Sequence, residues 1–290
     1  MTRIPLAQVC YVRLGTRAIE ESARFATEIL GLQRVTTDNG EAAFRSDALS
    51  HRICLTKESP DDQSVGIELL DETFIAPARD TLEARGFVVR DATADECRRR
   101  FVRQALITMD GSGNSIELVA RPAHSGRRYF PSRDAGIVGF QGVGLRSTNL
   151  ARDLEFWTTV LGANVADRVG DVCYLQIDAR HHRIALYPSE RKGVLDVSLE
   201  VESLDCVMQS KYFLQDRQVR IVHGPGKETA SDQVFLRFLS PDGYVFSYVH
   251  GMQDVDLKRR PRQYQLRPES FCSWGSEASD LPELAALPST

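Results

Sequence analysis

The chain contains segments in which apolar side chains recur every three or four positions, separated by shorter runs that alternate apolar and polar residues. The first spacing is typical of an amphipathic helix with one buried face. It predicts four helices, two of which are followed by a glycine, Gly31 and Gly162, at the position that commonly ends a helix. The helices are expected at residues 18–30, 73–85, 150–161 and 203–217.

The alternating runs have the period of two that predicts β-strands. The last of them, YVFSYV, follows a turn formed by Pro241, Asp242 and Gly243. The other predicted strands read RICLT, SVGIELL, RQALITMD, SIELVA, CYLQID, RIALYP, DVSLEV and VFLRFL. Helices and strands together indicate an α+β protein.

The two halves of the chain repeat one another. FATEILGL begins at Phe25 and FWTTVLGA at Phe156, while SHRICL begins at Ser50 and HHRIAL at His181, so both offsets are 131 residues (156 minus 25; 181 minus 50). SVGIEL and DVSLEV are offset by 132 residues. A nearly constant offset over several segments indicates a tandem duplication.

Each half also contains two passes of a helix followed by strands. We therefore expect four βαβββ units, paired into an N-terminal module at residues 1–122 and a second module at 136–250. Each module should curve its sheet around a pocket. The tail, residues 251–290, should pack outside the modules.

Composition narrows the functional classes. Hydrophobic residues make up 42% and charged residues 26% of the chain, which is enough for a substantial core. The net charge of −4 does not indicate a protein that binds nucleic acid. We expect the basic tract KRRPR at 258–262 to be a solvated linker. No apolar run is long enough for a membrane helix or a secretory signal, so we expect neither a nucleic-acid nor a membrane partner and a cytoplasmic location.

Six cysteines are scattered along the chain without a CxxC pair. This spacing indicates neither a disulfide framework nor a zinc cluster. We expect most of them to be buried small hydrophobes.

Several motifs in fixed order resemble the vicinal oxygen chelate superfamily, which is built from paired βαβββ units. They are RHHRIAL, the LEV strand at 199–201, the PDGY turn and the tail motif SFCSWGS at 270–276. More narrowly, nearly the whole chain is similar to the two-module type I extradiol dioxygenases, such as 2,3-dihydroxybiphenyl 1,2-dioxygenase. The tail departs from the usual SxWGH pattern, because Ser276 stands where the histidine would be. The resemblance implies a small aromatic substrate and a homo-oligomer.

The resemblance also implies an iron site in the second module, held by two histidines and a glutamate that leave positions open for catechol and oxygen. In this resemblance, the three ligand positions of the family correspond to Gly142, Asp196 and Ser247. Glycine offers no side chain and one aspartate cannot hold Fe(II) by itself. We therefore expect the triad to be replaced, with no metal and no cofactor bound.

The equivalent positions of the first module are Tyr11, Ser64 and Glu117, which form no better ligand set. Two further positions of the second module differ from the family pattern. Glu228 stands where an acid/base histidine is common, and Arg237 where a tyrosine faces the substrate.

These replacements define a candidate site. A histidine with a near-neutral pKa can be tuned by a carboxylate, so we nominate His181, Asp196 and Glu228 as catalytic residues. An arginine can bind an anionic substrate in bidentate fashion. The nominated substrate-binding residues are His182, Arg237, Ser247, Tyr244 and Gly142.

The two adjacent histidines are not equivalent in the repeat. His182 corresponds to His51 of the first module, which favours an architectural role, whereas His181 corresponds to Ser50 and is the better candidate for chemistry. Neighbouring strand residues point to opposite faces, so a register error would exchange the two. The plainer alternative is that both are hydrogen-bonded sheet residues, with Arg237 neutralising carboxylates at a solvated rim.

Three functions remain open at this point. The favoured one is a metal-independent enzyme that acts on an aromatic, catechol-like or ring-cleaved small molecule by acid/base chemistry, as a lyase, hydrolase or isomerase. The second is a divergent extradiol ring-cleavage dioxygenase with an atypical metal or none. The third is a non-catalytic protein that binds an aromatic ligand.

Overall fold

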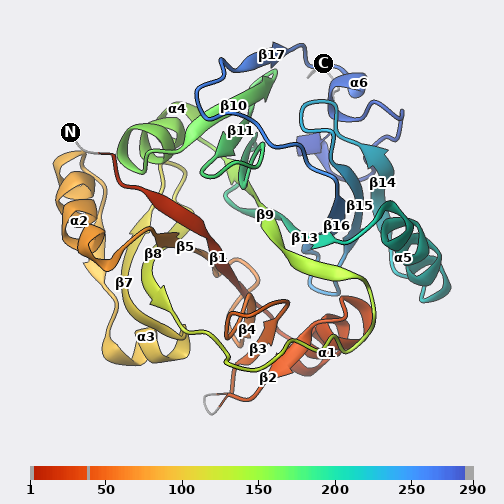
Figure 1. Ribbon diagram of the computed structural model, residues 1–290, viewed down its shortest axis with the longest axis horizontal. Coiled ribbons are helices and arrows are strands. Elements are labelled where there is room, and N and C mark those ends of the chain that lie inside the picture. Colours follow the sequence, from red (N-terminus) through yellow and green to blue (C-terminus); the bar gives the residue numbers. More distant parts are fainter. Residues whose placement is uncertain (1–2, 38–39, 285–290) are drawn as a thin grey trace. The chain divides into compact units, whose positions relative to one another are not determined.

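The structure is a computed structural model that describes residues 3–37 and 40–284. Contacts divide the chain into two units, one of residues 1–133 and 148–163 and the other of residues 134–147 and 164–290. Each unit contains one mixed β-sheet, with the strands of the first drawn in red to yellow and those of the second in green to blue (Figure 1).

The first unit has an eight-stranded sheet in the order β2-β3-β4-β1-β5-β8-β7-β6. Strands β1 to β4 form one βαβββ pass and β5 to β8 the next, and the two passes are joined by antiparallel pairing of β1 with β5. The strands are β1 (Leu6–Gly15), β2 (Gln33–Val35), β3 (Ala42–Arg45), β4 (Ile53–Thr56), β5 (Gln63–Leu69), β6 (Val89–Asp91), β7 (Val102–Met109) and β8 (Ser115–Pro122).

The second unit repeats this topology in a nine-stranded sheet of order β14-β15-β16-β13-β9-β12-β11-β10-β17. The four expected βαβββ units are therefore confirmed. Strand β17 comes from the tail and extends the sheet by pairing in parallel with β10. The strands are β9 (Ile137–Ser147), β10 (Asn164–Val169), β11 (Val172–Gln176), β12 (Ile184–Pro188), β13 (Gly193–Val201), β14 (Ile221–Lys227), β15 (Val234–Leu239), β16 (Val245–His250) and β17 (Arg262–Tyr264).

All four expected helices form. Gly31 and Gly162 adopt φ values of +80° and +72° just after two of them, the left-handed conformation that ends a helix at little steric cost in glycine. In both of these helices an α-helical turn continues into a wider π-helical turn over the repeated segments FATEI and EFWTTV. The helices are α1 (Ile19–Arg24) with η1 (Phe25–Ile29), η2 (Glu72–Phe74) with α2 (Ile75–Ala84), α4 (Leu150–Leu154) with η3 (Glu155–Val160), and α5 (Leu204–Asp216).

Three short helices were not expected: α3 (Ala94–Arg99), α6 (Pro268–Phe271) and η4 (Pro282–Leu284). Helix α3 is only six residues long, which is too short to show the apolar periodicity of an amphipathic helix. Its signal in the sequence is a capping box, in which the Thr93 hydroxyl accepts from the Glu96 amide and the Glu96 carboxylate accepts from the Thr93 amide.

The described part of the tail packs on the second sheet. Phe271, Leu281 and Leu284 join a buried apolar cluster with side chains of β10 to β14 and β16. Burying one such side chain contributes about 1.5–3 kcal/mol relative to leaving it exposed, so the tail contributes to the core of this unit.

The basic tract at 258–262 is not a solvated linker, contrary to expectation. Arg259 donates to Asp167 Oδ1 (2.9 Å), and Arg262 donates to Asp167 Oδ2 from Nε (3.0 Å) and from a terminal nitrogen (2.7 Å). The Asp167 side chain is fully buried, and a buried carboxylate requires charged or hydrogen-bonding partners. The tract therefore anchors the tail to β10.

The structure also bears on membrane-spanning helices and on the state of the cysteines. No helix of the described residues is long and apolar enough to cross a membrane. The six cysteines are all free thiols, and all except the half-buried Cys206 are buried, as predicted.

The Asp167 anchor can be tested by Asp167→Asn, which keeps the shape of the side chain but removes its charge. We expect the free energy of unfolding at pH 7 to fall by about 3 kcal/mol, because two arginines and a histidine lose their anion. Hydrogen–deuterium exchange should become faster in residues 251–264. Asp171→Asn, at an exposed turn next to the same strand, is the control and should change neither quantity.

The pKa of Asp167 also predicts how the stability of the protein depends on pH. Burial by itself raises the pKa of Asp167, but hydrogen bonds from His181 and Arg262 outweigh burial and hold the pKa well below its usual range. The stability it contributes is therefore complete above the unfolded-state pKa of about 4 and is lost as the pH falls further. Between pH 7 and pH 3 the free energy of unfolding, measured with urea, should fall less in Asp167→Asn than in the wild type. Equal falls in the two proteins would contradict the assignment.

Candidate functional site

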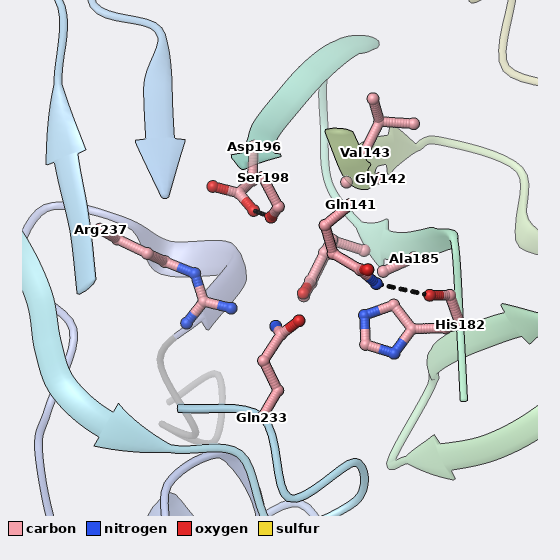
Figure 2. A pocket seen from close by; sticks show the side chains of 11 residues that line it. Gln141, Gly142, Val143, His182, Ala185, Asp196, Ser198, Gln233 and Arg237 are labelled. Carbon is pink, nitrogen blue, oxygen red and sulfur yellow. Dashed lines mark hydrogen bonds between the residues drawn. The ribbon is translucent and has the colours of Figure 1, made fainter. Parts of the chain in front are cut away.

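A pocket in the second unit contains about 290 Å³ of space that no protein atom occupies, part of it open to solvent. Its walls come from β9, β12, β13 and β15 and from the loops that precede β12 and β15. Figure 2 shows Asp196 and Arg237 on one side, His182 on the other and Gln233 between them. The lining residues are Gln141, Gly142, Val143, Gly144, His182, Ala185, Tyr187, Asp196, Ser198, Gln233 and Arg237.

The three positions nominated as replaced metal ligands lie on three adjacent strands. Gly142 of β9 pairs with Ser198 of β13, which in turn pairs with Ser247 of β16, and Asp196 lies two residues before Ser198 on the same face. The Asp196 carboxylate accepts hydrogen bonds from the hydroxyls of Ser198 (2.7 Å) and Ser247. Each of its oxygens therefore accepts one hydrogen bond from the protein.

The backbone closes the space around Gly142. A Cβ atom built there would overlap the carbonyl group of Arg183, which also accepts a hydrogen bond from the Val143 amide (3.0 Å). No side chain fits at position 142 without moving the strand next to it. The glycine is thus required by the close approach of two backbone segments.

The two adjacent histidines point to different places. The His181 side chain is fully buried and hydrogen-bonded through Nε2 to Asp167 (2.8 Å), whereas the His182 ring lines the pocket (Figure 2). The pair lies in the loop before β12 rather than in a strand, so strand alternation does not decide which ring faces inward. In the structure His182, not His181, therefore lines the pocket.

The two rings share a hydrogen bond between their Nδ1 atoms (3.0 Å). When His181 carries only the Nε2 proton that it donates to Asp167, His182 donates the shared proton and its own Nε2 is left as an acceptor; when His181 carries both ring protons, it donates to His182, whose Nε2 then carries a proton. Burial, reinforced by the neighbouring His181 and Arg237, lowers the pKa of His182 well below its usual value. His182 is consequently neutral near pH 7 and can offer either ring form to a ligand.

Arg237 is 4% exposed and carries its charge into the pocket. It donates from one terminal nitrogen to Nδ1 of His223 (3.2 Å), and Nε2 of His223 donates to the carbonyl of Ser276 (3.0 Å). Burial and the charge of Arg237 lower the pKa of His223 to about 3, so this histidine is neutral and can accept. The tail carbonyl thereby fixes the position of the arginine.

Two buried polar atoms of the pocket lining have no hydrogen-bond partner among the residues that the structure describes: Nε of Arg237 and Oε1 of Gln233. Leaving such an atom unpaired costs about 1–3 kcal/mol. A ligand that offers an acceptor to Arg237 and a donor to Gln233 would remove both costs. These two atoms therefore mark where polar groups of a ligand would bind.

The remaining nominated residues lie farther from the pocket. Glu228 is buried behind Arg237, with its carboxylate 3.9 Å from an Arg237 nitrogen and 4.0 Å from Nδ1 of His182, and it accepts from the Ser231 hydroxyl. Tyr244 is buried at the turn before β16 and does not line the pocket. Of the eight nominated residues, four line the pocket: Gly142, His182, Asp196 and Arg237.

Several lining residues were not nominated from the sequence. Gln141 lies next to Gly142 and would face away in a regular strand, but a register shift between β9 and β13 makes it the extra residue of a bulge. Its side chain donates to the His182 carbonyl (3.0 Å; Figure 2). Gln233 lies in a loop, where no periodic pattern indicates the direction of a side chain.

The corresponding space in the first unit is filled. The Tyr11 ring stacks on His51 with a centroid distance of 4.7 Å, and a Cβ on Gly66 would overlap that ring. The Tyr11 hydroxyl donates to Glu117, which also accepts two hydrogen bonds from Arg100 (2.7 and 2.8 Å). A tyrosine therefore occupies the position that corresponds to Gly142, where the second unit has no side chain.

The residues of the second-unit pocket do not fit an Fe(II) ion. Within residues 3–37 and 40–284, no group of three or more His, Cys, Asp and Glu side chains is arranged to hold a metal. Asp196 is the one carboxylate of the described lining, and its oxygens already accept two hydroxyl hydrogen bonds. A set of two histidines and one carboxylate with open positions is not present there.

Comparisons with known proteins identify relatives of this chain. The sequence profile of the Glyoxalase/Bleomycin resistance protein/Dioxygenase superfamily matches residues 139–248. The chain is 26% identical over 250 residues to 3-methylcatechol 2,3-dioxygenase of Pseudomonas putida, covering 80% of this chain and 85% of that protein. It is 25% identical over 224 residues to an iron-dependent extradiol dioxygenase of Rhodococcus jostii, covering 70% and 75%.

The fold also matches a solved structure. The crystal structure of a halotolerant catechol dioxygenase superposes with a TM-score of 0.87 at 23% identity, covering 96% of this chain and 97% of that one. At this level of identity the match shows a shared fold.

These relatives correct the favoured functional interpretation. A metal-independent enzyme working by acid/base chemistry is not supported, because the homologous proteins are named as dioxygenases. A divergent ring-cleavage dioxygenase fits the comparisons better. Homology to enzymes also supports an enzyme over a purely structural protein.

The close approach at Gly142 can be tested by Gly142→Ala. We expect the free energy of unfolding to fall by about 1–3 kcal/mol, because the added methyl group must displace the Arg183 backbone. Gly139→Ala is the matched control in the same strand, since a Cβ there meets nothing within 4 Å. Urea unfolding measures both variants, and equal stabilities would contradict the steric argument.

Proposed function

Since residues 139–248 are a Glyoxalase/Bleomycin resistance protein/Dioxygenase superfamily domain and the chain is homologous to extradiol dioxygenases, we propose that the protein is a divergent ring-cleavage dioxygenase. Its substrate is a catechol-like aromatic molecule bound in the second-unit pocket. The homology over four fifths of the chain is the observation that carries this proposal. The reaction would open the aromatic ring and add both atoms of O₂ to the product.

The lining supports binding of a catechol. One catechol oxygen would accept from the unpaired Nε of Arg237, and the adjacent hydroxyl would donate to Oε1 of Gln233 or to Nε2 of His182. A buried cation favours the ionised form of a neighbouring hydroxyl. Arg237 would therefore lower the pKa of the bound catechol, and the resulting anion is more electron-rich and reacts more readily with O₂.

We further propose that the metal-ligand triad of the extradiol dioxygenases has been replaced in this chain by Gly142, Asp196 and Ser247. The donor set does not fit Fe(II), and the backbone at Gly142 leaves no room for a ligand side chain. Oxygen chemistry at this site would then use an atypical metal or none. In either case Arg237 and His182 would bind and orient the substrate.

The same observation favours a second candidate, a non-catalytic homologue that binds an aromatic ligand unchanged. Such a protein would keep the polar anchors Arg237, Gln233 and His182 but would not consume oxygen. The expected cytoplasmic location and homo-oligomeric state stay predictions under either candidate.

Oxygen uptake separates the two candidates. Purified protein is given catechol and 3-methylcatechol in an oxygen electrode, with the metal content measured by elemental analysis on the same sample. A dioxygenase should consume about one O₂ per catechol and form a ring-opened product that absorbs in the visible range. A catechol that binds but is recovered intact, without oxygen consumption, would reject the proposal in favour of the binding protein.

The roles of the lining residues can be tested by His182→Gln and Arg237→Gln. We expect each to lower kcat/KM about a hundredfold, the effect typical of losing a positioned proton-transfer group or a charged anchor. Tyr244→Phe is the control, because Tyr244 does not line the pocket. Thermal melting of each variant separates a lost function from a lost fold. A folded Arg237→Gln protein with unchanged kcat/KM would rule out the anchor.

A further inference from the structure

We propose that the first unit carries a binding site for a small polyanion, a molecule bearing phosphate or carboxylate groups, in a cleft beside strands β2 and β3. The cleft encloses about 860 Å³, part of it open to solvent. All of its described lining residues lie between positions 33 and 127, so this site is separate from the second-unit pocket and does not depend on the function proposed for it.

The lining of this cleft is strongly basic. Three arginines and one histidine contribute to it, and none of its described lining residues is acidic. The protein as a whole has a net charge of −4, so a local concentration of positive charge is unusual for it. The basic residues are Arg34, Arg45, Arg127 and His124.

The environment of Arg45 supports an anion site independently of the basic composition of the lining. Its side chain is almost fully buried, and its guanidinium donates to Oε1 of Gln33 (2.8 Å), to the carbonyl of Arg127 (2.9 Å) and to the carbonyl of Arg128. All three acceptors are neutral, and no carboxylate of the described residues forms an ion pair with Arg45. A buried charge without a counter-ion is costly, and an anion in the cleft would offset that cost.

The same hydrogen bonds shape the cleft. By donating to two successive carbonyls, Arg45 holds the backbone of residues 127–128 against the end of β3. Arg127 is thereby placed at the rim with an exposed side chain that forms no ion pair within the described chain. Arg34, which also lines the cleft, is half exposed and lies 3.7 Å from Glu20, a distance at which an exposed pair contributes little.

The neutral lining residues suit an anion that carries an apolar part. Ser50 and Ser125 offer hydroxyl donors, and Phe101 is the aromatic residue of the described lining. Phe101 adopts a φ of +52°, which is unfavourable for a bulky residue. Such backbone strain is concentrated at ligand-binding positions, where the surrounding structure maintains it.

Arginine is the residue that best matches phosphate and carboxylate, because its planar fork donates two parallel hydrogen bonds. A cleft lined by three arginines fits an anion with two or more charged groups better than a single chloride. The chemistry is shared by phosphorylated molecules and by polycarboxylates, and the choice between them is left to the experiment.

The test is isothermal titration calorimetry of the full chain with pyrophosphate and, separately, with citrate, at matched ionic strength. We expect saturable binding of at least one of the two with one site per chain, and the tighter one identifies the anion class. Arg127→Ala and Arg34→Ala should each weaken that binding about tenfold. Both residues are exposed, and an unchanged melting temperature confirms that the variants fold.

Arg128→Ala is the matched control, because Arg128 is exposed and adjacent in sequence but its side chain does not line the cleft. It should leave binding unchanged. The proposal is overturned if neither anion binds saturably, or if Arg128→Ala weakens binding as much as Arg127→Ala, since the latter result would mean attraction to surface charge alone.

Discussion

The buried carboxylate of Asp167 is the constraint on which the second unit depends. It lies on β10, accepts hydrogen bonds from two arginines of the tail and from the ring of His181, and is fully inaccessible to solvent. The arginines bring β17 alongside the sheet, and His181 in turn holds the ring of His182 at the wall of the pocket. One buried charge thus couples the docking of the tail to the position of a ligand-facing side chain.

The duplicated sheets show how one fold can hold an open pocket in one copy and a filled one in the other. Both units have the same strand order around their central pair, but Tyr11 fills the space in the first unit, while the matching residue of the second, Gly142, has no side chain. Glycine at this position also lets the Arg183 backbone come close. The backbone packing at Gly142 and the side chains of the pocket therefore both bear on the proposal that the ligand triad has been replaced.

Much of the architecture could be predicted from the sequence, because a constant repeat offset and clear helical and strand periods are local signals. The positions to which the resemblance assigns the metal ligands, Gly142, Asp196 and Ser247, lie on three adjacent strands, because both halves of the chain repeat one strand order. The orientation of the histidine pair could not be predicted, because it is set by a carboxylate on another strand and the pair lies in a loop. Gln141 was missed because a bulge, which leaves no signal in the alternation, turns it inward.

The central claim is that a catechol binds beside His182 and Arg237 in the second unit. It is tested most directly by an anomalous-difference map from a crystal of the protein soaked with 4-bromocatechol under anaerobic conditions. The account predicts a bromine peak in this pocket, with the catechol oxygens in hydrogen-bond contact with Arg237 and with His182 or Gln233. A pocket without the peak at full soaking, or a catechol bound only elsewhere, would contradict it.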